Sequence, residues 1–173
     1  MANVIERTGV YGSAAGPLTL IGPELHAGDR APDFELEDDN GRKVRLSDFA
    51  GRRVVLAFYV LANTPGCAGE LRAYQDGLAE FERTGAQILG ISVNKPAANR
   101  EFSKKLGLTF PLLCDPEKKV TKQYGVLNFL RLASRTTFVL DSQGVIRHIE
   151  RGRDALTPAS ALKVCRLASP KSD

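Results

Sequence analysis

The sequence contains no tryptophan, one methionine and two histidines, and it has only three cysteines among 173 residues. The cysteines, Cys67, Cys114 and Cys165, are odd in number and widely separated. Zinc knuckles and disulfide-stabilised scaffolds use closely spaced or paired cysteines, so this pattern argues against both. We therefore expect no metal ion, and a reducing compartment, the cytoplasm.

Long apolar segments and an excess of one charge are also missing. The longest apolar run, residues 54–62, is too short to cross a bilayer, and residues 1–7 lack the apolar segment of a secretory signal. The chain carries 24 basic and 20 acidic residues, a net charge of +4. The basic residues are scattered, without an aromatic-rich basic stripe. We therefore expect neither a membrane nor a nucleic-acid partner.

The run of residues 54–62 is rich in β-branched and aromatic side chains, which predicts a buried central strand. Asn63 or Thr64 can cap the helix that follows, and Pro65 fits its first turn. Cys67 then falls in that first turn, where unpaired N–H groups and the helix dipole stabilise a thiolate. A helix N-terminus with a nearby cation lowers a cysteine pKa from about 8.5 to roughly 3.5–7.5. This position favours a reactive thiol; the alternative is a buried cysteine that packs as a small apolar residue.

Strand and helix patterns alternate along the chain, which predicts the α/β class with a central mixed sheet and helices on both faces. We predict an N-terminal hairpin over 5–11 and 18–21, strands at 34–37, 43–46, 54–62 and 86–93, a short edge strand at 110–113, strands at 136–140 and 145–149, and helices at 67–84, 97–106, 115–124 and 157–167. No linker divides the chain, so we expect one domain over residues 1–173.

Four segments resemble the peroxiredoxin family in their order and in their residues. They are Ala31-Pro32-Asp33-Phe34, Leu46-Ser47-Asp48-Phe49-Ala50-Gly51, Asn63-Thr64-Pro65-Gly66-Cys67 and Arg135-Thr136-Thr137-Phe138-Val139-Leu140-Asp141. The resemblance covers residues 28–167. The part around Cys67 is similar to the bacterioferritin-comigratory-protein branch, whereas the N-terminal hairpin and residues 124–135 are similar to the bacterial thiol peroxidase branch.

The resemblance implies a thioredoxin-like fold, with residues 28–167 as the core and residues 1–27 as a β-hairpin extension. It also implies reduction of hydrogen peroxide or alkyl hydroperoxides without a metal or flavin cofactor. By the same resemblance, Cys67 is the peroxidatic cysteine, Thr64 supplies a hydroxyl that orients peroxide and thiolate, and Arg135 stabilises the thiolate and the leaving oxygen. Glu70 would hold that arginine by an ion pair. The simpler alternatives are a helix cap for Thr64, a surface arginine for Arg135 and a solvated helix acid for Glu70.

The sequence also departs from the family pattern. Val60 stands where the family site has a proline, which suggests that the central strand runs further before the chain turns toward Cys67. Arg72 and Ser103 occupy the two usual positions of a resolving cysteine.

Of the other two cysteines, we expect Cys114 to be buried and Cys165 to be accessible. We predict a one-cysteine cycle on Cys67, with an external thiol or a thioredoxin-like protein as reductant, in a monomer or homodimer. The alternative is a peroxiredoxin-like scaffold that acts as a redox sensor or binding protein. A thioredoxin-type reductase is disfavoured because no second cysteine lies three residues from Cys67.

Overall fold

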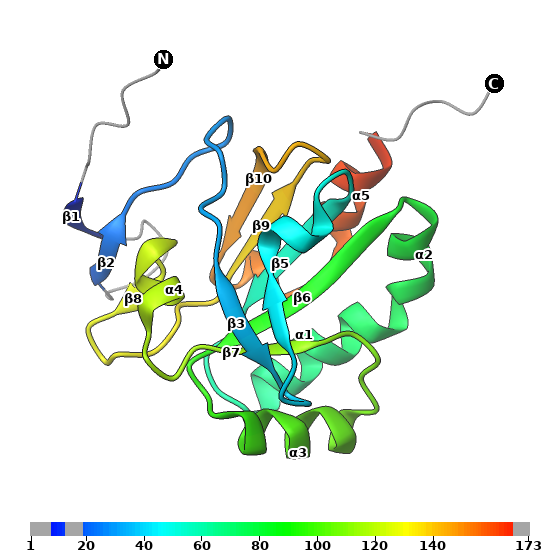
Figure 1. Cartoon of the computed structure of the whole chain (residues 1–173), viewed down its shortest axis with the longest axis horizontal. Coiled ribbons are helices and arrows are strands. Elements are labelled where there is room, and N and C mark those ends of the chain that lie inside the picture. The colour runs from blue at the N-terminus through cyan, green and yellow to red at the C-terminus, as the bar shows by residue number, and fades with distance from the viewer. Residues whose placement is uncertain (1–7, 13–18, 168–173) are drawn as a thin grey trace.

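The computed structural model describes residues 8–12 and 19–167 (Figure 1). The strands are β1 (Thr8–Gly12), β2 (Thr19–Pro23), β3 (Glu35–Asp38), β4 (Lys43–Arg45), β5 (Arg53–Phe58), β6 (Ala86–Ser92), β7 (Leu112–Cys114), β8 (Leu127–Asn128), β9 (Thr136–Leu140) and β10 (Ile146–Arg151). The helices are α1 (Pro65–Asp76), α2 (Leu78–Arg83), α3 (Pro96–Leu106), α4 (Lys119–Gln123) and α5 (Ala159–Leu167), with 3-10 helices η1 (Leu46–Phe49) and η2 (Asp154–Leu156). Within these residues, no helix has the length and apolar character needed to span a bilayer.

The main sheet has seven strands in the order β10-β9-β5-β6-β7-β3-β4. Strands β5, β6 and β7 run parallel to one another, and β9, β10, β3 and β4 join them by antiparallel pairing. Successive side chains of a strand point to opposite faces of the sheet. On β5, Leu56 and Phe58 therefore pack in one apolar cluster, and Val55 and Ala57 pack in another with side chains of α1, α2, α3 and α5. The predicted mixed sheet flanked by helices is confirmed.

A second, small sheet lies beside the main one, with the order β1-β2-β8 (Figure 1, lower left). The strands β1 and β2 pair in antiparallel fashion from Thr8↔Pro23 to Gly12↔Thr19, in agreement with the predicted hairpin. Residues 5–7 and 13–18 of that prediction lie outside the described residues. Strand β8 joins β2, so the N-terminal strands pair with a segment more than a hundred residues away.

The single helix predicted over residues 67–84 is instead two helices, α1 and α2, separated at Gly77. The backbone N–H of Gly77 still donates to the Ala73 carbonyl at 3.1 Å, so the break comes after the last turn of α1 is closed. Glycine weakens a helix at such a position because it has no side chain to limit backbone freedom. Phe81, on α2, remains buried in the same cluster as Leu71 and Tyr74 of α1.

Two strand predictions were also wrong. The predicted edge strand at residues 110–113 is β7, which lies inside the sheet because β3 pairs with it on the side away from β6. The central strand ends at Phe58 rather than at Ala62, so it does not run through Val60. The bond from the Tyr59 N–H to the Ile91 carbonyl, 3.0 Å long, is the last one toward β6 before the chain leaves the sheet.

Candidate functional site

Cys67 lies in the first turn of α1, which follows β5 after a short loop. Thr64 occupies the N-cap position and Pro65 opens the helix, so Cys67 falls in the first turn as predicted. The thiol is 1% exposed and packs in the apolar cluster beneath the helices. The Thr64 hydroxyl does not cap the helix; it donates to the Leu61 carbonyl at 3.0 Å, which tightens the turn before the helix.

Arg135 reaches Cys67 from a neighbouring strand. It directly precedes β9, whose first residue Thr136 pairs with Phe58 at the end of β5. The Arg135 Nη2 atom donates to Cys67 Sγ at 3.5 Å, and its side chain is only 19% exposed. A Cβ atom on Gly66 would lie 3.4 Å from that same nitrogen, so the guanidinium lies close to the backbone at the start of α1. The geometry places a fixed positive charge beside the sulfur.

Glu70 holds Arg135 from the same face of α1 that carries Cys67, since residues three apart are neighbours on a helix. Arg135 Nε donates to Glu70 Oε2 at 2.8 Å. The Glu70 side chain is fully buried, and its Oε1 has no hydrogen-bond partner within the described part of the chain. Burial raises the pKa of Glu70 to about 7, although the bond to Arg135 opposes the rise. For Arg135, burial opposes the charged form but the contacts with Glu70 outweigh it and raise the pKa of the guanidinium.

The raised pKa of Glu70 predicts a specific pH dependence of stability. Between its ordinary value of 4.5 and its folded value of about 7, the folded protein keeps a proton that the unfolded chain has released. The free energy of unfolding should therefore fall as the pH rises through this window. The stabilising contribution of the Glu70 proton should be fully present only at a pH below the window. In Glu70→Gln this contribution is absent.

Urea unfolding at about pH 5 and about pH 8 tests this dependence. Relative to the parent, Glu70→Gln should gain stability between the two pH values, by a few kcal/mol at most, since one pKa unit corresponds to about 1.4 kcal/mol. Glu101→Gln, an exposed glutamate on α3, serves as the matched control and should show no such change. Parallel pH profiles for the parent and Glu70→Gln would contradict the buried ionisation.

A polar network that the sequence did not reveal fixes the chain between β5 and α1. The Ala62 N–H donates to Asn94 Oδ1 at 2.9 Å, and the Ser92 hydroxyl donates to the same oxygen at 3.1 Å. Deeper in the protein, the Tyr59 hydroxyl donates to Asn99 Oδ1 at 2.7 Å. The sequence did contain one signal for this network: polar residues follow two neighbouring parallel strands, and the ends of such strands meet at one edge of the sheet. The loop that follows Val60 is thus tied to the end of β6.

This network predicts that Asn94 positions Cys67, the candidate reactive cysteine. Asn94→Ala removes the acceptor for the Ala62 N–H, so the approach to α1 should loosen, and peroxide reduction should slow by roughly 10- to 100-fold, since small misplacements are costly in rate. Asn94→Asp keeps an acceptor oxygen and should restore most of the rate. Stopped-flow measurement of peroxide reduction gives the comparison. Equal loss in both variants would show that the bond to Ala62 is not what matters.

Residues 27–149 match the model of the AhpC/TSA family. The chain belongs to this family. The match spans the strands and helices that carry Cys67, Glu70 and Arg135.

Individual AhpC/TSA relatives agree with this assignment. The chain is 41% identical to the chloroplastic peroxiredoxin Q of Oryza sativa over 139 residues, which are 79% of this chain and 64% of that protein. The chain therefore spans less than two thirds of the length of this relative. The crystal structure of peroxidoxin BcpB from Mycobacterium tuberculosis superposes with a TM-score of 0.79 at 32% identity, and the match covers 83% of this chain and 98% of that one.

A structure of the bacterioferritin comigratory protein of Xanthomonas campestris superposes with a TM-score of 0.74 at 26% identity, over 79% of this chain and 92% of that one. The predicted resemblance to peroxiredoxins and the predicted thioredoxin-like fold are confirmed.

The other two cysteines of this AhpC/TSA protein are buried. Cys114 is 3% exposed, as predicted, and accepts a hydrogen bond from Asn99 Nδ2 at 3.3 Å. Cys165 was expected to be accessible, and this expectation was wrong. It is 0% exposed because α5 turns it toward the sheet and the helices α1 and α2. Burial raises the pKa of both thiols to about 11, so both are poor nucleophiles in the folded protein.

Proposed function

We propose that this protein is a thiol-dependent peroxidase that reduces hydrogen peroxide and alkyl hydroperoxides through Cys67. The observation that carries the proposal is the 3.5 Å contact between Cys67 Sγ and Arg135 Nη2, with Arg135 held by the buried Glu70. Relatives in the same family are named peroxiredoxins, and the study of the Xanthomonas protein names its alkyl peroxide reduction activity.

In this mechanism the Cys67 thiolate attacks one oxygen of the hydroperoxide, and the O–O bond breaks. The sulfur becomes a sulfenic acid, and the other oxygen leaves as an alkoxide or hydroxide that takes up a proton to give an alcohol or water. Arg135 stabilises negative charge first on the sulfur and then on the leaving oxygen, which is the form of electrostatic stabilisation with the largest effect on rate. Thr64 supplies the hydroxyl that orients the peroxide once it turns from the Leu61 carbonyl.

The cycle closes with an external reductant. A thiol condenses with the sulfenic acid to give a mixed disulfide and water, and a second thiol releases Cys67 as the other disulfide forms. A small thiol or a thioredoxin-like protein fits this role, since Cys114 and Cys165 are buried. In this proposal the peroxidase works in the cytoplasm as a monomer or homodimer and needs no cofactor.

Two observations favour a second function, a redox sensor without efficient turnover. Cys67 is 1% exposed, and Val60 replaces the proline that shields and shapes the family's site. A sensor would be oxidised once by peroxide and would not consume it further.

Steady-state peroxide consumption with several thiol donors separates the two functions. A peroxidase consumes many equivalents of peroxide per Cys67 with at least one donor, and a sensor consumes only one. Cys67→Ser gives the background rate of each thiol.

A one-cysteine cycle predicts that Cys114→Ser and Cys165→Ser each retain most of the peroxidase activity with a small thiol. Both thiols are buried and have a raised pKa, so neither is placed to attack a sulfenic acid on Cys67. Initial rates of the two variants, normalised to the folded fraction, provide the measurement. Loss of turnover in Cys165→Ser together with a Cys67–Cys165 disulfide in the oxidised parent would contradict the one-cysteine cycle.

A further inference from the structure

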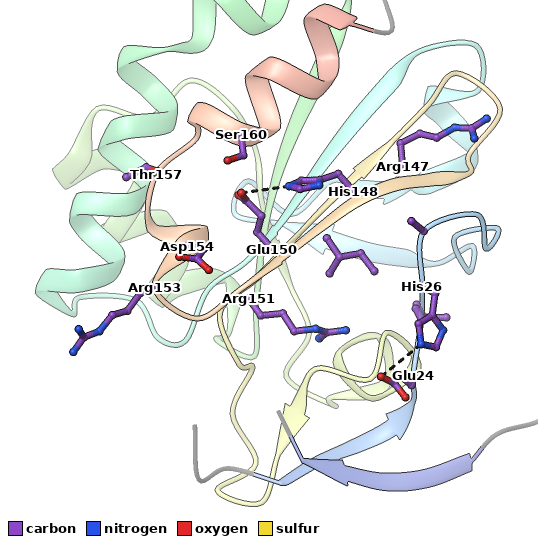
Figure 2. Close-up of a pocket in the computed structure, with 13 residues that line it drawn as sticks. Glu24, His26, Arg147, His148, Glu150, Arg151, Arg153, Asp154, Thr157 and Ser160 are labelled. Atoms are coloured by element: carbon purple, nitrogen blue, oxygen red, sulfur yellow. Dashed lines mark ion pairs between the residues drawn. The ribbon is translucent and has the colours of Figure 1, made fainter. Parts of the chain in front are cut away.

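A cleft of about 870 Å³ lies along β10, and Cys67 is not one of the residues that line it (Figure 2). Its walls are β10, the segment 24–27 that follows β2, and the residues from η2 to the start of α5. Cavities of 300–1,000 Å³ are the usual size of sites for small organic ligands. Three residues that line the cleft each have a buried polar atom without a hydrogen-bond partner in the described part of the chain: His148 Nε2, Glu150 Oε2 and Arg151 Nη1.

Strand β10 is the edge of the sheet and divides the cleft into two parts. Glu150 pairs with Thr137, and Arg151 pairs with Thr136, so the two side chains lie on opposite faces. Thr137 lies on the face covered by α1, since its hydroxyl is 3.2 Å from the Tyr74 hydroxyl. Glu150 therefore lies on the α1 side, and Arg151 lies on the opposite face, separate from the Cys67 site.

On the α1 side, the two ionisable side chains of β10 lie next to each other. Glu150 Oε1 is 3.3 Å from His148 Nε2, and Figure 2 shows both side chains beside Ser160. The Glu150 carboxylate already has the His148 imidazole beside it, so this part of the cleft does not require an external charge.

On the other face, Arg151 Nη1 has no hydrogen-bond partner among the described residues, and Arg151 forms no ion pair with them. In Figure 2 its side chain extends from β10 toward the segment that carries Glu24 and His26. Its neighbours are already paired: Arg147 with Asp141 at 2.7 Å, and His26 with Glu24 at 3.5 Å. Arg151 is partly buried, and a guanidinium without a partner is stabilised by an anion. Its planar fork fits a carboxylate with two parallel hydrogen bonds.

The side chains around Arg151 indicate which class of anion it can bind. Leu25 and Ile149 are partly buried and pack on the adjoining core, and Ile149 lies on the same face of β10 as Arg151. These side chains offer an apolar surface beside the cation. Glu24 lines the cleft next to Leu25, and its negative charge would repel a doubly charged anion such as phosphate more strongly than a singly charged one. We propose that this part of the cleft binds a monocarboxylate with an apolar chain, its carboxylate on Arg151 and its chain along Leu25 and Ile149.

Calorimetric titration of the folded protein with octanoate tests the site. The parent should bind octanoate, and Arg151→Gln should bind it at least tenfold more weakly. Arg153→Gln is the matched control: Arg153 also lines the cleft, but it is exposed, and in Figure 2 its side chain extends away from those of Arg151 and His26, so this variant should bind as the parent does. Thermal unfolding of the three proteins shows whether the fold is kept.

Chemical shifts of the parent locate the bound molecule without any substitution. Octanoate should shift the resonances of Leu25, Ile149 and Arg151 and leave those of α1 in place. No binding, equal binding by Arg151→Gln, or shifts confined to other residues would each overturn the proposal. Displacement of octanoate by an equal concentration of inorganic phosphate would overturn the monocarboxylate class, since it would show that the site recognises charge alone.

Discussion

Replacing Cys67 by serine should reduce thiol-dependent peroxide consumption to the background rate of the thiol itself. Serine keeps the size and position of the side chain, so the helix start should remain intact. Its hydroxyl is not ionised near neutral pH and does not attack a peroxide, so the reaction loses its nucleophile. Steady-state peroxide consumption and circular dichroism of the parent and the variant together separate loss of chemistry from loss of fold.

The same prediction has a chemical readout in the parent. After one equivalent of peroxide, a sulfenate-selective probe should label Cys67, because it is the thiol in contact with Arg135. The Cys114→Ser variant is the matched control and should label equally, since Cys114 is buried and its pKa is raised to about 11. Peptide mass spectrometry locates the label. Labelling confined to Cys114 or Cys165 would refute the role of Cys67.

Arg135→Met should slow peroxide reduction by roughly 10²–10³, the usual effect of removing one donor that stabilises a developing negative charge. Methionine fills a similar length of side chain without the guanidinium, so the hydrogen bond to Cys67 is lost and Glu70 is left buried without its cation. A thiolate without its cationic neighbour is less stable, so the reaction should also need a higher pH to reach half of its maximal rate.

Stopped-flow rates across a pH series give both quantities for Arg135→Met. Arg131→Met is the control, since Arg131 is an exposed arginine in the same connection between β8 and β9, and it should leave rate and pH profile unchanged. If the pH dependence and the size of the rate were the same for Arg135→Met and the parent, Arg135 would have no role in the mechanism. A loss of rate without any shift in pH would limit its role to the leaving oxygen.

Features set by short stretches of sequence could be predicted. The connection between β9 and β10 is an example, because Asp141 accepts hydrogen bonds from the N–H groups of Gln143 and Val145 within its own turn. The start of α1 is another, since Thr64 and Pro65 fix the helix boundary by their own backbone preferences. The position of Cys67 in the first helical turn followed from these local rules.

Features that depend on distant segments could not be predicted. The burial of Cys165 depends on which face of α5 turns toward the sheet, and a nine-residue helix near the end of the chain carries little periodic signal. The interior position of β7 depends on β3, which comes from more than seventy residues earlier in the chain. The bond from Ala62 to Asn94 joins two loops that only the parallel pairing of β5 and β6 brings together. The conformational preferences of short stretches of sequence do not predict any of these pairings.

Because all three cysteines are buried, the rate at which each thiol reacts with a reagent reports how often its segment of the protein opens. Their exposures are 1%, 3% and 0% for Cys67, Cys114 and Cys165, so an alkylating reagent reaches each thiol only when its segment opens. Cys67 needs fraying of the first turn of α1, Cys165 needs detachment of α5, and Cys114 needs separation of strands inside the sheet. Alkylation rates of the three thiols in one native sample therefore measure three opening free energies. For the proposed peroxidase, the one at Cys67 would also set how often peroxide gains access to the sulfur.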